Sequence, residues 1–274
     1  MQLDIHDSRM SLQAYIDGIG VLGPGLADWP SAARVLAGGR RYAPAAAVLP
    51  APAILPAAER RRTGRVVKLA IAVALEATAH AGVEPRRLAS VFSSSGGDGH
   101  NCHEICLALA AADREISPTR FSNSVQNAAS GYWSIAVGAM QASNMLCAYD
   151  ASFAAALLDA LAQIAVDRQP LLLVAYDTEY PPPLHAKRPI PDAFGVALVL
   201  SAARSERTIA RIDAALGEDA AQRLADGGLE ALRTAIPAAR SLPLLQALAN
   251  PEPSRTVIDY LDALRLRVEV LPCA

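Results

Sequence analysis

Three side chains that could do chemistry stand together in the stretch 144–153, NMLCAYDASF, where an apolar strand-like segment runs into a helical one. A turn of this kind commonly displays a nucleophile, because the helix N-terminus favours a negative charge. Cys147, Tyr149 and Asp150 are the candidates. Cys147 lies three residues before Asp150, inside the predicted strand. Since side chains alternate along a strand, we favour a core position for this thiol over a reactive one.

Other polar clusters match catalytic and metal-binding patterns poorly. A Ser-His-Asp hydrolase needs Gly-x-Ser-x-Gly around its nucleophile, and Ser152 has no flanking glycines. His185 is the only histidine that follows it. His100 and His103 lack the His-Glu-x-x-His spacing of a zinc site, so we interpret them as polar residues at a helix start. No metal or cofactor is expected.

The glycine-rich loop 93–99, SSSGGDG, is a weak candidate for a phosphate site, because it has no lysine at its end. We favour a tight turn in which Asp98 caps the following helix. Cys102 and Cys106 lie four residues apart on that helix, and we expect both to be core thiols.

Strands and helices alternate around these residues. Strands are predicted at 13–22, 89–94, 143–149, 171–176, 194–201 and 208–214, and helices at 27–37, 60–81, 99–112, 125–141 and 151–166. This alternation predicts an α/β fold with a mainly parallel five-stranded sheet covered by helices. Segments 194–201 and 208–214 are expected to be antiparallel additions, and the tail to hold short helices and a final strand at 266–271.

The composition bounds the class of protein. Of 274 residues, 52% are hydrophobic and 19% charged, so a buried core is expected and disorder is not. The net charge of -2 argues against a nucleic-acid partner. The N-terminus has acidic residues and no apolar run typical of a signal peptide, and no apolar run has the length of a membrane span. We expect a cytoplasmic protein.

Several segments, in order, resemble the β-ketoacyl synthases of the thiolase fold. They are 16–24 with Trp29, 91–97, 116–138, and 188–200 with its Arg-Pro and Gly-Val-Ala-Leu-Val-Leu motifs. The resemblance covers about residues 13–215. It implies the first half of the ketosynthase architecture as a domain over 1–215, with a short α-rich tail over 216–274 packed on the same domain.

The departures from this family concern its catalytic residues. Aligned without gaps from Ile116, the chain has Asp150 where the family has its nucleophilic cysteine. A carboxylate cannot form the thioester of the transfer step. The family's two histidines, in a His-Gly-Thr-Gly-Thr loop and a Gly-His segment, have no counterpart here. The resemblance therefore implies no catalytic residue, and the chain is similar to chain-length-factor subunits, above all the small ones of aryl polyene pathways.

Such a subunit would pair with a full-length β-ketoacyl synthase as a heterodimer, meet acyl carrier protein through that complex, and possibly form a homodimer alone. The strand 143–149 would then pair with the partner, and helices 99–112 and 125–141 would face its acyl pocket. Candidates for pocket or interface are Phe121, Asn127, Tyr132, Trp133, Met140, Tyr149 and Phe153. The alternative for the aromatic residues among them is ordinary core packing.

Two other functions stay open at this point. One is a divergent acyltransferase or decarboxylase that uses Asp150, with His185, for acid/base chemistry. The other is a homodimeric scaffold without a substrate pocket.

Overall fold

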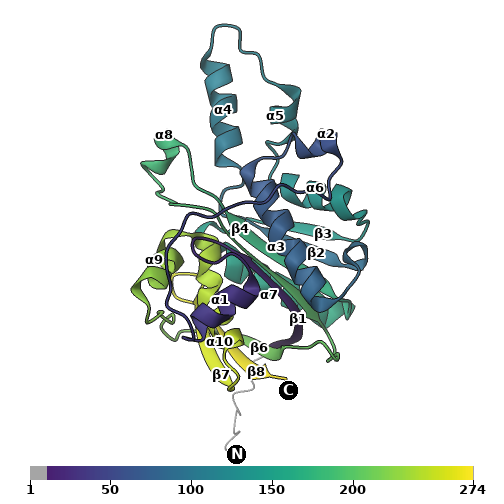
Figure 1. The fold of residues 1–274 in the computed structure, drawn as a ribbon, viewed down its shortest axis with the longest axis vertical. Helices are drawn as coiled ribbons and strands as arrows, with labels where there is room; N and C mark the ends of the chain where they lie inside the picture. Colours follow the sequence, from purple (N-terminus) through teal and green to yellow (C-terminus); the bar gives the residue numbers. More distant parts are fainter. Residues whose placement is uncertain (1–10, 274) are drawn as a thin grey trace, which may run out of the picture.

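A single eight-stranded sheet organises the chain in the computed structural model, which describes residues 11–273 (Figure 1). The strand order is β3-β2-β4-β5-β1-β6-β8-β7. The strands are β1 (Leu12–Leu22), β2 (Ala89–Ser93), β3 (Ser143–Leu146), β4 (Leu171–Asp177), β5 (Phe194–Ser201), β6 (Ala210–Gly217), β7 (Ser254–Asp259) and β8 (Arg265–Pro272). The pairs β2–β3 and β2–β4 are parallel, and the other neighbouring pairs are antiparallel.

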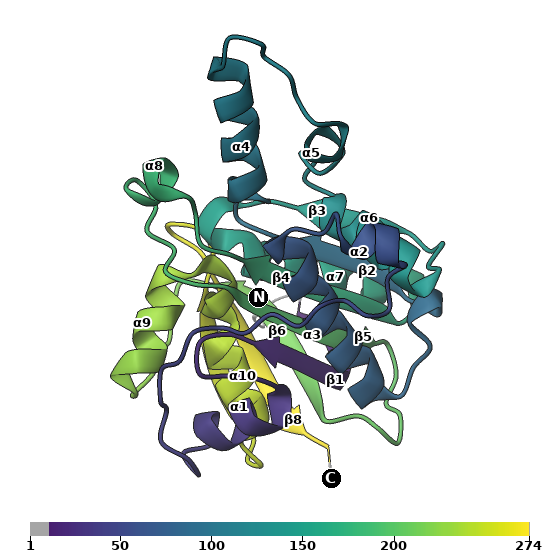
Figure 2. The ribbon, with the colours of Figure 1, turned by 45° about the horizontal axis from the view of Figure 1, so that its top comes forward.

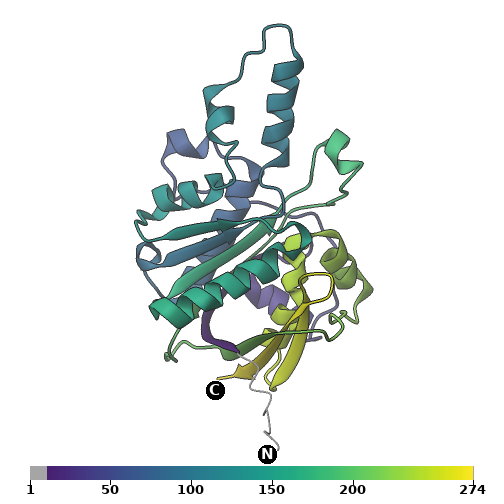
Figure 3. The ribbon, with the colours of Figure 1, turned by 180° about the vertical axis from the view of Figure 1, so that it is seen from behind.

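Helices cover both faces of the sheet (Figures 1 and 3). The helices are α1 (Trp29–Leu36), α2 (Ala57–Arg60), α3 (Arg65–Ala81), α4 (Gly99–Ala110), α5 (Pro118–Ser122), α6 (Ala128–Val137), α7 (Ser152–Asp167), α8 (Pro182–His185), α9 (Gly227–Ala235) and α10 (Leu242–Ala249). Short 3-10 turns are η1 (Pro85–Arg87), η2 (Tyr149–Ala151) and η3 (Pro237–Ser241).

The central strand β4 shows how the two faces are built. Leu171, Leu173 and Ala175 pack into the cluster that contains α1, α7 and α10. The alternate residues Leu172 and Val174 pack into the cluster that contains α3 and α6. Because successive side chains of a strand point to opposite faces, a continuous apolar run is what a strand covered on both sides requires.

The sequence predicted the α/β class and most elements, but three expectations need correction. The sheet has eight strands rather than five, because β6, β8 and β7 extend it beyond β1. It is mixed rather than mainly parallel. The strand predicted at 143–149 ends at Leu146, where the chain leaves the sheet. The tail also holds a strand that the prediction missed, β7, beside the expected β8. The predicted division at 215/216 falls within β6 and remains a prediction.

A helical arm stands out from the body. Helix α4 projects beside α5, with a loop joining their far ends (Figures 1 and 2). Only Gly99 and Asn101 of α4 are buried. Leu107 and Leu109 are about half exposed. The arm therefore presents apolar side chains that no other part of residues 11–273 covers.

Helix α7 is long and strongly apolar. Residues 149–167 are by length and composition long and apolar enough to cross a membrane. However, Phe153, Leu157 and Leu161 are buried in the core. Packing against the sheet therefore explains the apolar composition of this helix.

Strand β1 and helix α3 approach unusually closely. A Cβ added at Gly20 would lie 2.1 Å from the carbonyl oxygen of Val73, and one added at Gly18 would lie 2.2 Å from that of Ala77. These neighbours are backbone atoms that cannot rotate away. The two glycines therefore let α3 lie against the middle of the sheet.

We predict that Gly20→Ala lowers the free energy of unfolding by about 2–3 kcal/mol, because α3 would have to move off β1. Urea unfolding followed by circular dichroism measures the change. Gly131→Ala is the matched control. It lies in α6 with no atom within 4 Å of the added Cβ, and it should stabilise by about 0.5–1 kcal/mol. An unchanged midpoint for Gly20→Ala would contradict the packing described.

Candidate functional site

The turn between β3 and α7 holds the residues that the sequence singled out. Tyr149 adopts a positive φ of 51°, a conformation that costs energy for a residue with a side chain. Ser152 fastens the turn: its hydroxyl accepts from the amide of Ala148 at 3.1 Å and donates to the carbonyl of Tyr149 at 2.7 Å. The turn therefore displays residues 149 and 150 in a fixed, strained conformation.

Asp150 forms ion pairs with two arginines. Arg188 Nη2 lies 2.7 Å from Asp150 Oδ1, and Arg240 Nη2 lies 3.0 Å from Asp150 Oδ2. The guanidinium of Arg188 also stacks over the ring of Tyr149, 3.7 Å from its centroid. Both carboxylate oxygens are thus engaged by guanidinium groups. No hydrogen bond or ion pair joins His185 to Asp150 in the described chain, so the acid/base pair considered from the sequence is not assembled.

The second carboxylate of the site is Asp177, which the sequence analysis missed. Asp177 ends β4 and is buried. Its Oδ1 accepts from the backbone amide of Ser95 at 2.8 Å and from the Ser95 hydroxyl at 2.6 Å. Its Oδ2 accepts from the amide of Ala238 at 2.9 Å. Burial raises the pKa of Asp177 to about 6, although these hydrogen bonds favour the ionised form.

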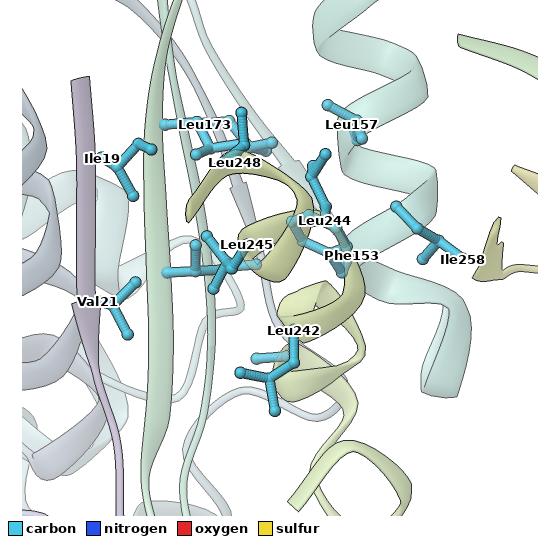
Figure 4. Close-up of a cluster of buried hydrophobic side chains, with 14 of the residues drawn as sticks. Ile19, Val21, Phe153, Leu157, Leu173, Leu242, Leu244, Leu245, Leu248 and Ile258 are labelled. Atoms are coloured by element: carbon cyan, nitrogen blue, oxygen red, sulfur yellow. The ribbon is translucent and has the colours of Figure 1, made fainter. Parts of the chain in front are cut away.

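Both carboxylates bind the same C-terminal segment. Ala238 and Arg240 belong to η3, which leads directly into α10. The leucines of α10 continue into the core: Figure 4 shows Leu242, Leu244, Leu245 and Leu248 with Phe153 and Leu157 of α7. The segment 237–249 therefore lies against the turn. Its η3 residues bind the two carboxylates, and its α10 leucines pack in the core beside α7.

The glycine loop forms the capped turn predicted from the sequence. Asp98 Oδ1 accepts from the amide of Asn101 at 2.9 Å, at the start of α4. His100 Nε2 lies 3.9 Å from Glu179 Oε1. Between residues 11 and 273, no group of three or more His, Cys, Asp or Glu is arranged to hold a metal.

The cysteines differ from expectation. Cys102, Cys106 and Cys147 are all exposed rather than buried. Cys102 and Cys106 are exposed because α4 projects from the body. Cys147 is exposed because β3 has already ended, and its thiol lies 3.3 Å from the carbonyl of Ser95.

The predicted pocket and interface residues separate into three groups. Trp133 and Phe153 are buried in the core clusters, which fits the packing alternative. Phe121, Met140 and Tyr149 are 69%, 93% and 63% exposed. Asn127 and Tyr132 line a cavity of about 400 Å³ between α5 and α6, where the Tyr132 hydroxyl lies 3.2 Å from Asn123 Oδ1.

Comparison with known families and structures places this geometry in context. Residues 29–257 match the family described as beta-ketoacyl synthase, N-terminal domain. The matched region extends past residue 215, through α9 and α10, so the resemblance noted in the sequence stopped too early. No curated protein matches the sequence.

Three solved structures illustrate the likeness. A chain of the ketosynthase (ApeO) in complex with its chain length factor (ApeC) from Xenorhabdus doucetiae is 22% identical, with a TM-score of 0.70, over 94% of this chain and 99% of that one. A chain of the ishigamide ketosynthase/chain length factor is 14% identical, with a TM-score of 0.69, over 96% and 100%.

The third is a chain of AntDE:AntF (apo), a type II PKS acyl-carrier protein in complex with its ketosynthase bound to the hexaketide. It is 12% identical, with a TM-score of 0.70, over 96% and 100% of the two chains. At these identities the likeness shows the fold. The predicted thiolase-like fold class is confirmed.

The raised pKa of Asp177 predicts a pH-dependent stability. Below about pH 4 its carboxyl is neutral in both the folded and the unfolded chain. As the pH rises to about 6 and above, the unfolded chain ionises first, so burial of the carboxylate costs stability. We expect the wild type to lose about 2–3 kcal/mol relative to Asp177→Asn between pH 4 and pH 7. Urea unfolding of both proteins at the two pH values measures this, and a relative gain of the wild type with pH would contradict it.

The ion pairs of Asp150 predict an energetic coupling between the turn and η3. The Arg240 side chain is 21% exposed and that of Asp150 is 39% exposed, so solvent screens the pair only in part. A double-mutant cycle of Asp150→Ala and Arg240→Ala should give a coupling of about 1 kcal/mol. The exposed pair Asp219–Arg255 is the control, with coupling near zero. Equal couplings in both cycles would show that Asp150 does not hold η3.

Proposed function

Because the chain belongs to the β-ketoacyl synthase family through its N-terminal domain, we propose that it is a non-catalytic, chain-length-factor-type subunit. It pairs with an active full-length ketosynthase and shapes the tunnel that holds the growing acyl chain. The pathway that we infer is polyene or fatty-acid-like biosynthesis of the aryl polyene type, in the cytoplasm, and the subunit needs no cofactor.

The observation that carries this proposal is the state of Asp150. It stands where the family resemblance puts the nucleophilic cysteine, and both of its oxygens are paired with arginines. A carboxylate cannot form the acyl thioester, and both oxygens of this one are already engaged by guanidinium groups. The strained turn therefore supports a structural role better than an acyltransferase or decarboxylase.

The open edge of the sheet supports pairing with another protein. Strand β3 is an edge strand, and α4, α5 and α6 lie on the same side of the molecule (Figures 1 and 2). These helices and the segments that follow them carry large exposed apolar side chains: Leu107, Leu109, Phe121, Val125, Ile135 and Met140. An unpaired edge beside exposed apolar side chains is a typical protein–protein interface. The length-matched chains of the ketosynthase/chain length factor structures favour a ketosynthase as the occupant over a second copy.

A cationic cavity lies next to this face and favours an anionic partner. It has a volume of about 530 Å³, and its lining includes Arg61, Arg65 and Arg120 but only one carboxylate, Asp98. The guanidinium of Arg61 has no hydrogen bond or ion pair with another residue in the range 11–273. We assign this cavity to the approach of acyl carrier protein once the complex has formed.

Co-expression with a full-length ketosynthase tests the proposal. We expect one complex on gel filtration and a change in product length when the subunit is omitted. Ile135→Asp or Met140→Asp should weaken the complex about 10–100-fold, because a charge would be buried at the interface.

Val48→Asp is the matched control, because Val48 is 83% exposed, belongs neither to β3 nor to α4–α6, and should tolerate the charge. Separate elution of the two proteins, together with a product length that ignores this subunit, would end the proposal. A homodimer that excludes the ketosynthase would favour the scaffold function instead.

A further inference from the structure

An apolar cavity unrelated to the turn lies between helix α3 and an extended proline-rich segment. It has a volume of about 420 Å³. Ile71, Ala72 and Leu75 of α3 form one wall, and residues 50–54, Pro-Ala-Pro-Ala-Ile, form the other. This size and composition fall in the range of small-molecule sites, which are mostly apolar with a few polar groups.

The proline-rich wall is fixed at both ends. The carbonyl of Ala45 accepts from Gly25 at 2.9 Å, and the amide of Ala47 donates to Asp192 at 2.9 Å. At the other end Leu55 is buried against α3. Pro50 and Pro52 have no N–H to satisfy, and the amide of Ala53 donates to the carbonyl of Ala51 at 2.8 Å, so this wall has few free donors. The cavity is therefore a built feature of the fold.

Three charged side chains line the cavity, and two of them are already engaged. Asp28 accepts from the amide of Ser31 at 2.8 Å. Glu76 accepts from the amides of Val21 at 2.8 Å and Trp29 at 2.5 Å, and burial raises its pKa. The third is Lys68, whose side-chain ammonium has neither a hydrogen bond nor an ion pair with any residue in the range 11–273.

The position of Lys68 makes the two ends of the apolar cavity chemically different. Lys68, Ala72 and Glu76 are spaced four residues apart on one face of α3, so the backbone positions of Lys68 and Glu76 lie roughly 12 Å apart along the helix. Lys68 also lines the cationic cavity that contains Arg65. Lys68 therefore lies where the apolar cavity adjoins the cationic cavity.

We propose that this cavity binds a single-chain amphiphile with a carboxylate head. The chain lies between α3 and residues 50–54, and the carboxylate pairs with Lys68. The match is one of charge and polarity: a lone unpaired cation at one end of an apolar cavity of about 420 Å³. The inference does not depend on the proposed ketosynthase partner, because none of these residues belongs to the β3 edge or the α4–α6 face.

The chain has two lysines, Lys68 and the exposed Lys187, which permits a direct experiment. Reductive methylation of the full-length protein with ¹³C-formaldehyde labels both side chains and keeps their charge. Titration with decanoate, followed by ¹³C NMR, should shift the Lys68 signal and leave that of Lys187 in place. 1-Decanol, which has the same chain without the charge, should bind roughly tenfold more weakly in calorimetry.

Variants separate the head group from the cavity. Lys68→Met should weaken decanoate binding roughly tenfold, and Lys187→Met should leave it unchanged. Ala72→Trp should abolish binding by filling the cavity. Should that variant not fold, Ala53→Trp on the exposed wall blocks the same space. Equal shifts of both lysines, equal affinity for decanol and decanoate, or undiminished binding to a folded tryptophan variant would each overturn the proposal.

Discussion

Two carboxylates decide how the C-terminal part of this chain sits on the rest. Asp177 is buried at the end of β4, and a buried carboxylate must be surrounded by donors. Ser95 supplies two of these donors. The third is the amide of Ala238, sixty-one residues after Asp177. Asp150 repeats this arrangement nearer the surface with Arg240. Without η3, both groups would lose donors and the leucines of α10 would be exposed to water. The tail is therefore part of the core.

Local patterns in the sequence predicted much of this fold, because most elements obey one period over their whole length. The strand at 194–201 was placed without error, and helices α3 and α7 within a few residues. The errors lie where neighbours in space override the local pattern. Residues 147–149 are apolar enough for a strand, but the chain turns to meet α7. The short β7 was missed because its sequence, SRTVID, gains its place from pairing with β8.

The site was harder to predict than the fold. Spacing identified Asp150 as the residue at the turn, but its partners Arg188 and Arg240 lie 38 and 90 positions away, beyond any local pattern. Asp177 carried one signal that could have been used, a carboxylate directly after a wholly apolar strand. The exposed cysteines of α4 show the opposite case. A helical period predicts which residues share a face, but it does not predict whether the body of the protein covers that face.

The open β3 edge and the exposed α4–α5 arm also affect how the chain behaves when nothing covers them. An unpaired strand beside exposed apolar side chains is a template for self-association, and its danger grows with the concentration of copies that lack a partner. The strand β3 has only four residues, which limits that danger but does not remove it. Synthesis in excess of whatever covers this edge would therefore yield aggregates. For the subunit function proposed above, balanced dosage of the two partners would be a physical requirement, as much as any catalytic residue is of an enzyme.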